Sequence, residues 1–332
     1  MNLVIVYGTR PEFLKLKPLI DLYNSLQIYI TVIKINQHEH LTEDTGYYHT
    51  VVTIDNLCND RISNIGASIL RKLPSLLCNS THILAQGDTA SVFYSLLCGF
   101  QMKKVCIHLE AGMRTYDLEN PFPEEGFRQM ISRIADIHLC PSELEREILH
   151  SEKVKGKIYV VGNTILDTVK SYKIPITHEK KVLITLHRRE NWGDFTDYII
   201  AISNLCRKYA DYKFYFVTHP NPNFHSILNE LQTDIAENMQ IMHSMPHYDL
   251  ITLLSSCSCV ITDSGGIQEE ANFLGKHMYV LRKVTERQSI SLERITLCTL
   301  DSIYTINCAV SNHTQGLEYG NGESCIEIIK NI

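Results

Sequence analysis

The feature of this sequence that most constrains its fold is an alternation of apolar, strand-like runs with helical patterns along nearly the whole chain. Strand-like runs lie at 2–7, 29–35, 82–85, 104–109, 137–140, 158–162, 181–187, 213–219, 239–243, 259–263 and 277–282. Strands that are apolar throughout and separated by helices are typical of parallel sheets buried on both faces. Strongly twisted open sheets rarely exceed about ten strands. The sequence therefore predicts an α/β protein with two doubly wound sheets.

The boundary between the two predicted domains lies near 168–180, a polar segment that contains Pro175. We therefore expect an N-terminal domain at 1–170 and a C-terminal domain at 171–332. If two such domains face one another, the carboxyl ends of their strands meet at the cleft between them. Ligands of doubly wound sheets bind at that edge, so the interdomain cleft is the expected active site.

Charge and apolar patterning exclude several classes of partner. The net charge of −6 and the absence of a Lys/Arg-rich tail argue against nucleic acid. No segment approaches the roughly 18 apolar residues of a membrane span. The N-terminus resembles a first strand more than a signal peptide, since no basic region precedes its short apolar run. We therefore expect a soluble, cytoplasmic protein without nucleic-acid or membrane partners.

The patterns that would indicate a metal or a cofactor are missing from the sequence. The 11 cysteines include no C-x-x-C pair, and several lie within apolar runs, where thiols behave as small hydrophobic groups. The first strand ends in YGTRPE with a single glycine, and neither G-x-G-x-x-G nor a P-loop is found. We therefore expect reduced thiols, no metal site, and no NAD or other cofactor.

An anion site is indicated where the strand-like run at 259–263 meets the stretch DSGGIQEE at 263–270. Adjacent glycines let backbone N–H groups approach an anion, and the following helix N-terminus favours negative charge. Arg10 lies in the GTRPE stretch after the first strand, although a surface arginine that caps its own loop is the alternative interpretation. The groups that suit a diphosphate are Arg10, Lys15, Ser264, Gly265, Gly266 and Arg287.

Candidate proton-transfer groups also lie at strand ends. Asp88 follows a strand in QGDT, where an N-cap is the alternative, and Glu110 ends a buried strand in HLEAG. Glu124 and Glu125 lie at an expected helix start, where carboxylates are often only dipole partners. His187 ends a strand of the second domain. Acids grouped in a closed cleft shift one another's pKa values, so Asp88, Glu110, Glu124 and His187 suit proton transfer.

At these residues the chain resembles the non-hydrolysing UDP-N-acetylglucosamine 2-epimerases. The matching stretches occur in the family's order over nearly the whole chain: GTRPE, QGDT, HLEAGMRT, PEEGFRQ, VGNTILDT, HRREN, HPNP, DSGGIQEEA, LRKVTER and YGNG. The resemblance implies a GT-B fold with two Rossmann-like domains, the nucleotide sugar between them, and a C-terminal helix that packs back on the N-terminal domain.

The resemblance also implies residue roles. The catalytic set it implies is Asp88, Glu110, Glu124 and His187. The set that holds UDP is Arg10, Lys15, Ser264, Gly265, Gly266, Glu270 and Arg287. Glu270 would accept hydrogen bonds from the ribose hydroxyls, whereas Glu269 is expected to be a solvated helix residue without a role.

The chemistry of the family needs no cofactor. A base removes the C2 proton while the C1–O bond to UDP breaks, which gives a glycal with a double bond between C1 and C2. UDP then adds again as a proton reaches the other face of C2. The implied substrate is UDP-N-acetylglucosamine or a related UDP-acetamido sugar such as a 6-deoxy-L-hexosamine. A homodimer in polysaccharide biosynthesis is the corresponding expectation.

Two other classes stay open at this point. One is a hydrolysing 2-epimerase that releases N-acetylmannosamine and UDP, and the other is a GT-B glycosyltransferase or an inactive nucleotide-sugar-binding protein. The sequence also departs from the family pattern in two places. Gln288-Ser289 follow TER where the family has Pro-Glu, and 36–41 differs in a region that helps bacterial members bind a second, activating UDP-sugar.

Overall fold

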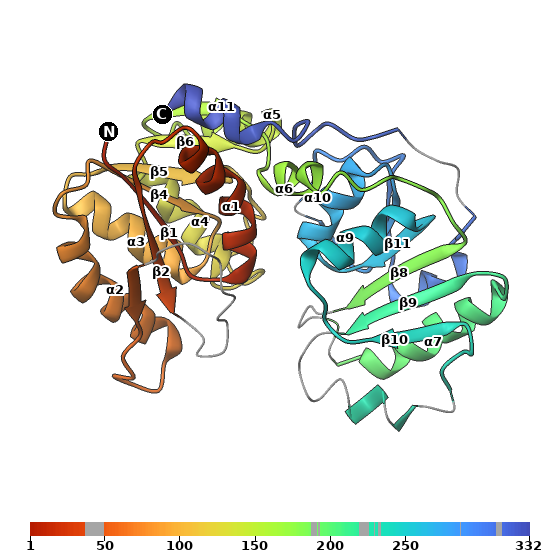
Figure 1. Ribbon diagram of the computed structural model, residues 1–332. Helices are drawn as coiled ribbons and strands as arrows, with labels where there is room; N and C mark the ends of the chain where they lie inside the picture. Colours follow the sequence, from red (N-terminus) through yellow and green to blue (C-terminus); the bar gives the residue numbers. More distant parts are fainter. Residues whose placement is uncertain are drawn as a thin grey trace. The chain divides into compact units, whose positions relative to one another are not determined.

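The computed structural model describes residues 1–36, 50–186, 191, 193–218, 226–228, 230–231, 234–285, 287–309 and 314–332. The chain divides into two compact units (Figure 1). Unit 1 comprises Met1–Thr168 together with Tyr319–Ile332, and unit 2 comprises Val169–Glu318. Helix α6 (Ile165–Ser171) contains the point at which the chain passes from unit 1 to unit 2.

Unit 1 is built on a parallel sheet of seven strands in the order β3-β2-β1-β4-β5-β6-β7. Its strands are β1 (Leu3–Tyr7), β2 (Ile30–Asn36), β3 (Thr50–Thr53), β4 (His82–Gln86), β5 (Val105–Leu109), β6 (Ile137–Cys140) and β7 (Lys157–Val160). Its helices are α1 (Arg10–Ser25), α2 (Arg61–Leu77), α3 (Ala90–Gln101), α4 (Glu124–Ile134), α5 (Glu143–Ser151) and α11 (Ser324–Asn331), besides α6.

Unit 2 repeats the arrangement with a parallel sheet of six strands in the order β10-β9-β8-β11-β12-β13. Its strands are β8 (Lys181–Leu186), β9 (Lys213–Thr218), β10 (Met239–Met242), β11 (Cys259–Thr262), β12 (His277–Val280) and β13 (Ile295–Leu297). Its helices are α7 (Phe195–Lys208), α9 (His247–Ser256), α10 (Gly265–Phe273) and a 3₁₀ helix at Leu300–Thr305.

The prediction of two doubly wound parallel sheets is confirmed. Strands β3 and β13 were not predicted, and both lie at a sheet edge. Only one residue of each is buried, Val52 in β3 and Ile295 in β13. An edge strand with one buried position lacks the continuous apolar run that marks the central strands, so its sequence signal is weak.

Each sheet reverses its strand order at one place, between β1 and β4 in unit 1 and between β8 and β11 in unit 2. Chains that leave two such neighbouring strands run to opposite faces of the sheet, which opens a crevice at the carboxyl ends of the strands. Gly8 and Asp88 follow β1 and β4, and Asp263 follows β11. The topology therefore brings the motif residues of each unit to that unit's switch point.

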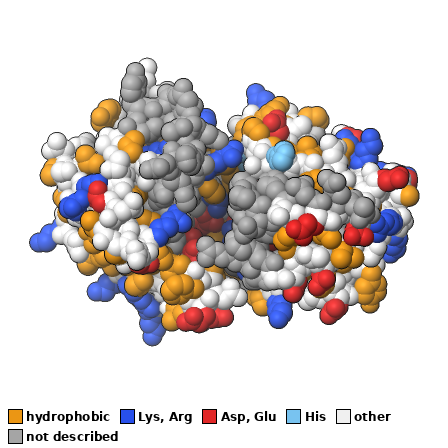
Figure 2. Space-filling model, turned by 90° about the horizontal axis from the view of Figure 1, so that it is seen from below, with side chains coloured by type: hydrophobic (Ala, Val, Ile, Leu, Met, Phe, Trp, Pro, Cys, Tyr) orange, Lys and Arg blue, Asp and Glu red, His pale blue; other side chains and the backbone are white. Residues whose placement is uncertain are grey.

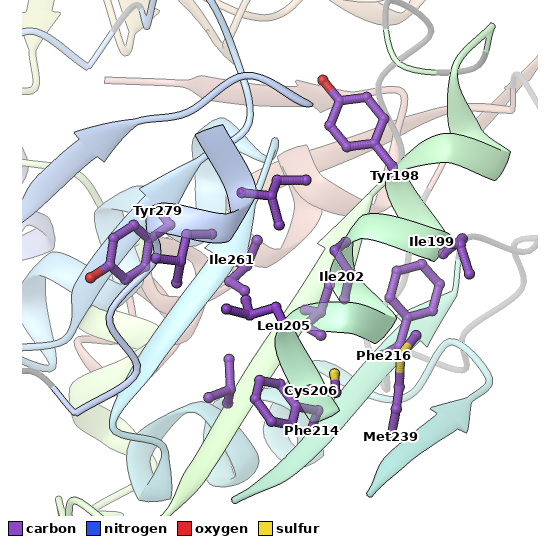
Figure 3. Close-up of a cluster of buried hydrophobic side chains, with 14 of the residues drawn as sticks. Tyr198, Ile199, Ile202, Leu205, Cys206, Phe214, Phe216, Met239, Ile261 and Tyr279 are labelled. Atoms are coloured by element: carbon purple, nitrogen blue, oxygen red, sulfur yellow. The ribbon is translucent and has the colours of Figure 1, made fainter. Parts of the chain in front are cut away.

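The core of unit 2 shows how alternation in the sequence becomes packing. Helix α7 directs Ile199, Ile202 and Cys206 toward the sheet, and these positions recur at helical spacing (Figure 3). On β9, Phe214 and Phe216 lie on the same face, two residues apart, and are fully buried against this helix. Core-facing side chains thus recur every 3.6 residues along the helix and every second residue along the strand against which it packs.

The last residues of the chain join unit 1 through two of the glycine motifs. Gly162 has φ +88, and a Cβ there would lie 2.6 Å from Ser324 Oγ and 2.9 Å from the Tyr319 carbonyl oxygen. The adjacent Asn163 N–H donates to that same Tyr319 oxygen at 2.8 Å. Cys325 and Ile328 of α11 are then buried beside α1. The VGNT and YGNG stretches therefore dock the terminal helix.

Candidate active site

The first functional cluster lies at the switch point of unit 1, where Glu12 joins two strand-end loops. Its carboxylate accepts the backbone N–H of Gly8 at 2.6 Å and that of Thr9 at 3.3 Å, and Thr9 Oγ1 accepts the Glu12 N–H in return. The Thr89 hydroxyl donates to its other oxygen at 2.7 Å. Only 4% of Glu12 is exposed, and desolvation raises the pKa of this carboxyl to about 7.

No role was predicted for Glu12. The sequence nevertheless contains a motif that indicates its local contacts, because T-x-x-E at positions 9 to 12 is a capping box. What the sequence could not show is the bond to Thr89, which lies 77 residues away along the chain. Arg10 is the first residue of α1 and is half-buried, so this network holds its backbone directly after the Gly8-Thr9 turn.

Asp88 is not an N-cap, and that alternative interpretation is wrong. Thr89 occupies the N-cap position of α3, and no side chain caps this helix. The Asp88 carboxylate instead accepts a hydrogen bond from Arg128 Nε at 2.8 Å, and a second guanidinium nitrogen lies 2.7 Å from the same oxygen. The QGDT loop is held further by buried His108, whose Nε2 donates to the Gly87 carbonyl at 2.8 Å. Burial lowers the pKa of His108 to about 4, so the ring is neutral at pH 7.

Glu110 leaves β5 in a strained conformation with φ +68. Side chains other than glycine rarely adopt this region, and holding one there costs on the order of 1 kcal/mol. Its carboxylate forms an ion pair with Lys15 Nζ at 2.6 Å, and Gln86 donates to the same oxygen. Lys15, predicted to hold a diphosphate, thus contacts one of the predicted catalytic acids within unit 1.

The two glutamates at the start of α4 have different surroundings. Glu125 is fully buried, and its carboxylate accepts the backbone N–H groups of Thr115 at 2.9 Å and Tyr116 at 3.2 Å. Gln129 and Arg128 contact the same carboxylate at 2.9 Å and 3.4 Å. Glu124 is half-buried at the first helical position. Glu125 therefore holds the loop before α4, whereas Glu124 is the more exposed of the two carboxylates.

The loop between β5 and α4 is anchored by an arginine. Arg114 forms a bidentate ion pair with Glu152, with nitrogen–oxygen distances of 2.7 Å and 2.9 Å, and donates to Ser132 at 2.7 Å. Bidentate geometry of this kind is both strong and directional. Arg114 is therefore a structural residue of the HLEAGMRT stretch, and with Glu125 it fixes the loop that precedes Glu124.

The second functional cluster lies at the switch point of unit 2, in the DSGGIQEE stretch. Asp263 is fully buried, and Asn191 donates to its carboxylate at 3.0 Å and to the Leu281 carbonyl at 3.2 Å. Ser264 is the N-cap residue of α10, which begins at Gly265. The predicted arrangement of strand, glycine turn and helix N-terminus is confirmed.

A guanidinium lies against this glycine turn. A Cβ added to Gly265 would lie 3.2 Å from Arg287 Cζ, so a larger residue here would push the guanidinium away by a few tenths of an ångström. Arg287 Nε forms an ion pair with Glu269 at 2.6 Å, and both side chains are at least 93% buried. The expectation that Glu269 is a solvated helix residue is therefore wrong. The segment that carries Arg287 covers this face of α10, and periodicity within the helix gives no sign of that segment.

Each residue of the Gln268-Glu269-Glu270 triplet has its own partner. Gln268 Oε1 accepts the Thr285 hydroxyl at 2.7 Å, which holds the backbone two residues before Arg287. Glu270 Oε1 contacts His247 Nε2 at 2.7 Å. Because successive helical residues point in directions about 100° apart, these adjacent side chains reach two different segments, the one that carries Thr285 and Arg287 and the start of α9. Gln268 and His247 carried no assignment from sequence analysis.

Part of the predicted site lies outside the described residues. This holds for His187, for the HPNP stretch, and for most of the segment at 36–41 that was compared with the activating region of bacterial relatives. Over the residues that are described, no group of three or more His, Cys, Asp and Glu side chains could hold a metal ion. Over the same ranges, no helix is long and apolar enough to cross a bilayer.

The surface carries mixed charge. On the face shown in Figure 2, basic and acidic side chains are interspersed among the coloured residues, without a continuous basic patch. Nucleic-acid-binding proteins concentrate lysine and arginine on one face to meet the phosphate backbone. Among the side chains that Figure 2 colours by type, no such concentration is seen on this face.

Comparison with known proteins places this geometry in a family. Residues 41–332 match the family model described as UDP-N-acetylglucosamine 2-epimerase. The enzyme of that name from Neisseria meningitidis serogroup A is 34% identical over 86% of this chain and 84% of its own length. The one from Salmonella borreze is 32% identical over 87% of this chain and 83% of its own.

A solved structure agrees in fold over both units. The crystal structure of UDP-GlcNAc 2-epimerase from Neisseria meningitidis bound to UDP-GlcNAc covers 99% of each chain with 28% identity and a TM-score of 0.85. The predicted GT-B fold, with two Rossmann-like units, is thereby confirmed. This chain belongs to the UDP-N-acetylglucosamine 2-epimerase family.

Proposed function

We propose that this chain is a non-hydrolysing epimerase that inverts C2 of a UDP-activated N-acetylhexosamine and interconverts UDP-GlcNAc and UDP-ManNAc. The observation that carries the proposal is the position of Asp88 after β4, of Glu110 after β5 and of Glu124 at the start of α4, in a chain of this family. The segments that bear these acids are held by contacts of Glu12, His108 and Glu125.

Unit 2 supplies the groups for UDP. The N-terminus of α10 presents the Ser264-Gly265-Gly266 turn, which suits a pyrophosphate because N–H groups and the helix dipole favour an anion there. Arg287 places its guanidinium at the same turn. The Glu270 carboxylate would accept hydrogen bonds from the ribose hydroxyls. These groups stabilise negative charge on UDP as it leaves C1, which matters because the C2 proton is only weakly acidic.

Unit 1 supplies the groups for proton transfer. In the proposed reaction one carboxylate removes the C2 proton as the C1–O bond breaks, and an acid delivers a proton to the opposite face as UDP adds again. Asp88, Glu110 and Glu124 are the candidates here, together with His187. Lys15 Nζ lies 2.6 Å from Glu110 Oε2, and in this proposal it also contacts a phosphate oxygen together with Arg10.

The decisive test follows UDP-GlcNAc in D₂O by ¹H and ³¹P NMR. We expect UDP-ManNAc that carries deuterium at C2, with activity that survives EDTA treatment and dialysis. Retention of the original hydrogen at C2 would exclude elimination through a glycal. Accumulation of free N-acetylmannosamine would show a hydrolysing enzyme instead. A panel of other UDP-acetamido sugars, including a 6-deoxy-L-hexosamine, would identify the preferred substrate.

The binding half of the proposal has its own test. Arg287→Ala should weaken UDP binding by about 10- to 100-fold, the range for hydrogen bonds to charged groups. An unchanged affinity would remove Arg287 from the nucleotide site. A cytoplasmic location, a homodimer and a role in polysaccharide biosynthesis remain part of the proposal, and sedimentation velocity tests the dimer.

A further inference from the structure

Three side chains of unit 2 form a hydrogen-bonded chain, of which the proposed function uses only Glu270. His247 begins α9, and its Nε2 lies 2.7 Å from Glu270 Oε1 of α10. Its Nδ1 lies 2.9 Å from the hydroxyl of Tyr172, which directly follows α6. The His247 and Glu270 side chains are only 10% and 6% exposed. His247 therefore links the segment after α6 to a buried carboxylate of α10.

The chemistry of the groups gives this chain a direction. A carboxylate only accepts hydrogen bonds, so His247 Nε2 must carry the proton that points at Glu270. In the neutral ring Nδ1 is then the acceptor, and the Tyr172 hydroxyl donates to it. The order is Tyr172 to His247 to Glu270. Tyr172 thus selects the His247 tautomer that the contact with Glu270 requires. Hydrogen-bond partners of metal-ligand histidines fix the tautomer in the same way.

Packing restricts the imidazole in the same orientation. The Tyr172 ring lies 5.6 Å from the His247 ring, centroid to centroid, and meets the Tyr248 ring edge-on at 5.1 Å. A ring with aromatic neighbours and both nitrogens bonded has little freedom to rotate. Glu270 Oε1 is therefore held in one place, and the orientation of its carboxylate plane is set before any ligand arrives.

A preorganised acceptor has a direct consequence for binding. A carboxylate that must be ordered by its ligand loses part of the interaction free energy to side-chain entropy, whereas one already ordered does not. We propose that His247 is a positioning residue for the nucleotide, which fixes the Glu270 carboxylate for the ribose hydroxyls and is itself fixed by Tyr172. This inference rests on the proposed function, in which Glu270 binds the ribose.

The experiment compares two ligands by calorimetry, UDP and 2′,3′-dideoxy-UDP, which lacks both ribose hydroxyls. His247→Leu should weaken UDP about tenfold but the dideoxy ligand less than about threefold, because only UDP uses the carboxylate. His247→Gln can place a donor near the Nε2 position and should recover most of the loss. Tyr172→Phe should give a smaller loss for UDP, about threefold. Tyr248→Phe keeps the aromatic packing and serves as the matched control.

The ligand pair separates failure of this inference from failure of the proposed site. If Glu270→Gln weakens UDP and the dideoxy ligand equally, Glu270 does not bind the ribose, and the proposed site is wrong there. If Glu270→Gln discriminates between the ligands but His247→Leu does not, the positioning role is overturned. In turnover the His247→Leu effect should fall on KM more than on kcat. A loss common to both ligands with a lower melting temperature would show a merely structural histidine.

Discussion

The two units use opposite pairing schemes at equivalent places in their sheets. In unit 1, basic side chains form ion pairs with two candidate catalytic acids. Arg128 pairs with Asp88, and Lys15 pairs with Glu110. In unit 2, the buried carboxylate of Glu269 forms an ion pair with Arg287, whose guanidinium lies beside Gly265. Both schemes lie beyond the carboxyl ends of parallel strands at a switch point.

This difference indicates a division of labour that follows from charge. Carboxylates at strand ends that pair with cationic side chains suit proton transfer. An arginine cannot be deprotonated in a protein, so a carboxylate beside it serves to fix a permanent positive charge for an anion. Changes at the candidate acids of unit 1 should therefore act mainly on turnover, and changes around α10 should act mainly on nucleotide affinity. Four predictions test that division.

The largest effect is expected at Glu110. Glu110→Gln keeps the shape of the side chain and its contact with Lys15 but removes the acid, so turnover should fall by about 10²- to 10⁴-fold. UDP affinity should change less than about threefold, which calorimetry measures beside the kinetics. Glu119→Gln, on an exposed position of the same loop region, is the matched control. A large loss of UDP affinity with normal turnover would reverse the assignment of unit 1.

The neighbouring pair at the start of α4 separates chemistry from scaffold. Glu125→Gln should lower the free energy of unfolding by about 1 to 3 kcal/mol, because two backbone donors lose their charged acceptor, whereas Arg128 keeps its ion pair with Asp88. Glu124→Gln should instead cut turnover by about 10²-fold at nearly unchanged stability. Urea denaturation and steady-state kinetics on both variants provide the comparison. If Glu124→Gln retained wild-type turnover, Glu124 would be only a dipole partner of the helix.

Glu12 predicts a pH dependence of stability that resides in unit 1. Desolvation raises the pKa of the Glu12 carboxyl from its ordinary value of 4.5 to about 7, so between these values the folded state binds a proton that the unfolded state has lost. The resulting stabilisation is fully present below about pH 4.5 and lost as pH rises through 7, by on the order of 3 kcal/mol. Glu12→Gln, which stays neutral, should lack this component. Equal slopes of unfolding free energy between pH 5 and 8 in both proteins would contradict the prediction.

The smallest effect is expected where the terminal helix joins unit 1. The Asp167 carboxylate accepts the backbone N–H groups of Ser324 and Cys325, at 3.1 Å and 2.9 Å, at the start of α11. Asp167→Asn should cost about 1 kcal/mol of stability, the usual worth of such a contact. UDP affinity should be unaffected, because Asp167 is not among the groups proposed to bind UDP. Asp21→Asn, at a partly exposed position where the side chain pairs with Lys17, is the control, and an equal effect there would remove the capping role.

The sequence by itself determined the α/β class, the two sheets, and the strand–glycine turn–helix site at α10. The reason is local: continuous apolar runs mark strands buried on both faces, and adjacent glycines at a strand end mark a close approach of the backbone. The motifs also identified the family. They did so because the stretches that contain Asp88, Glu110 and the other strand-end side chains occur along this chain in the family's order.

Only the tertiary structure decided which partner each of these side chains has. Glu269 is buried because a segment 18 residues further along the chain covers it, and Asp88 pairs with Arg128 from 40 residues away. Tyr319 and the residues after it group with unit 1, although the chain reaches them through unit 2. Such contacts depend on how elements pack in three dimensions, whereas periodicity within a single element reports only its own faces.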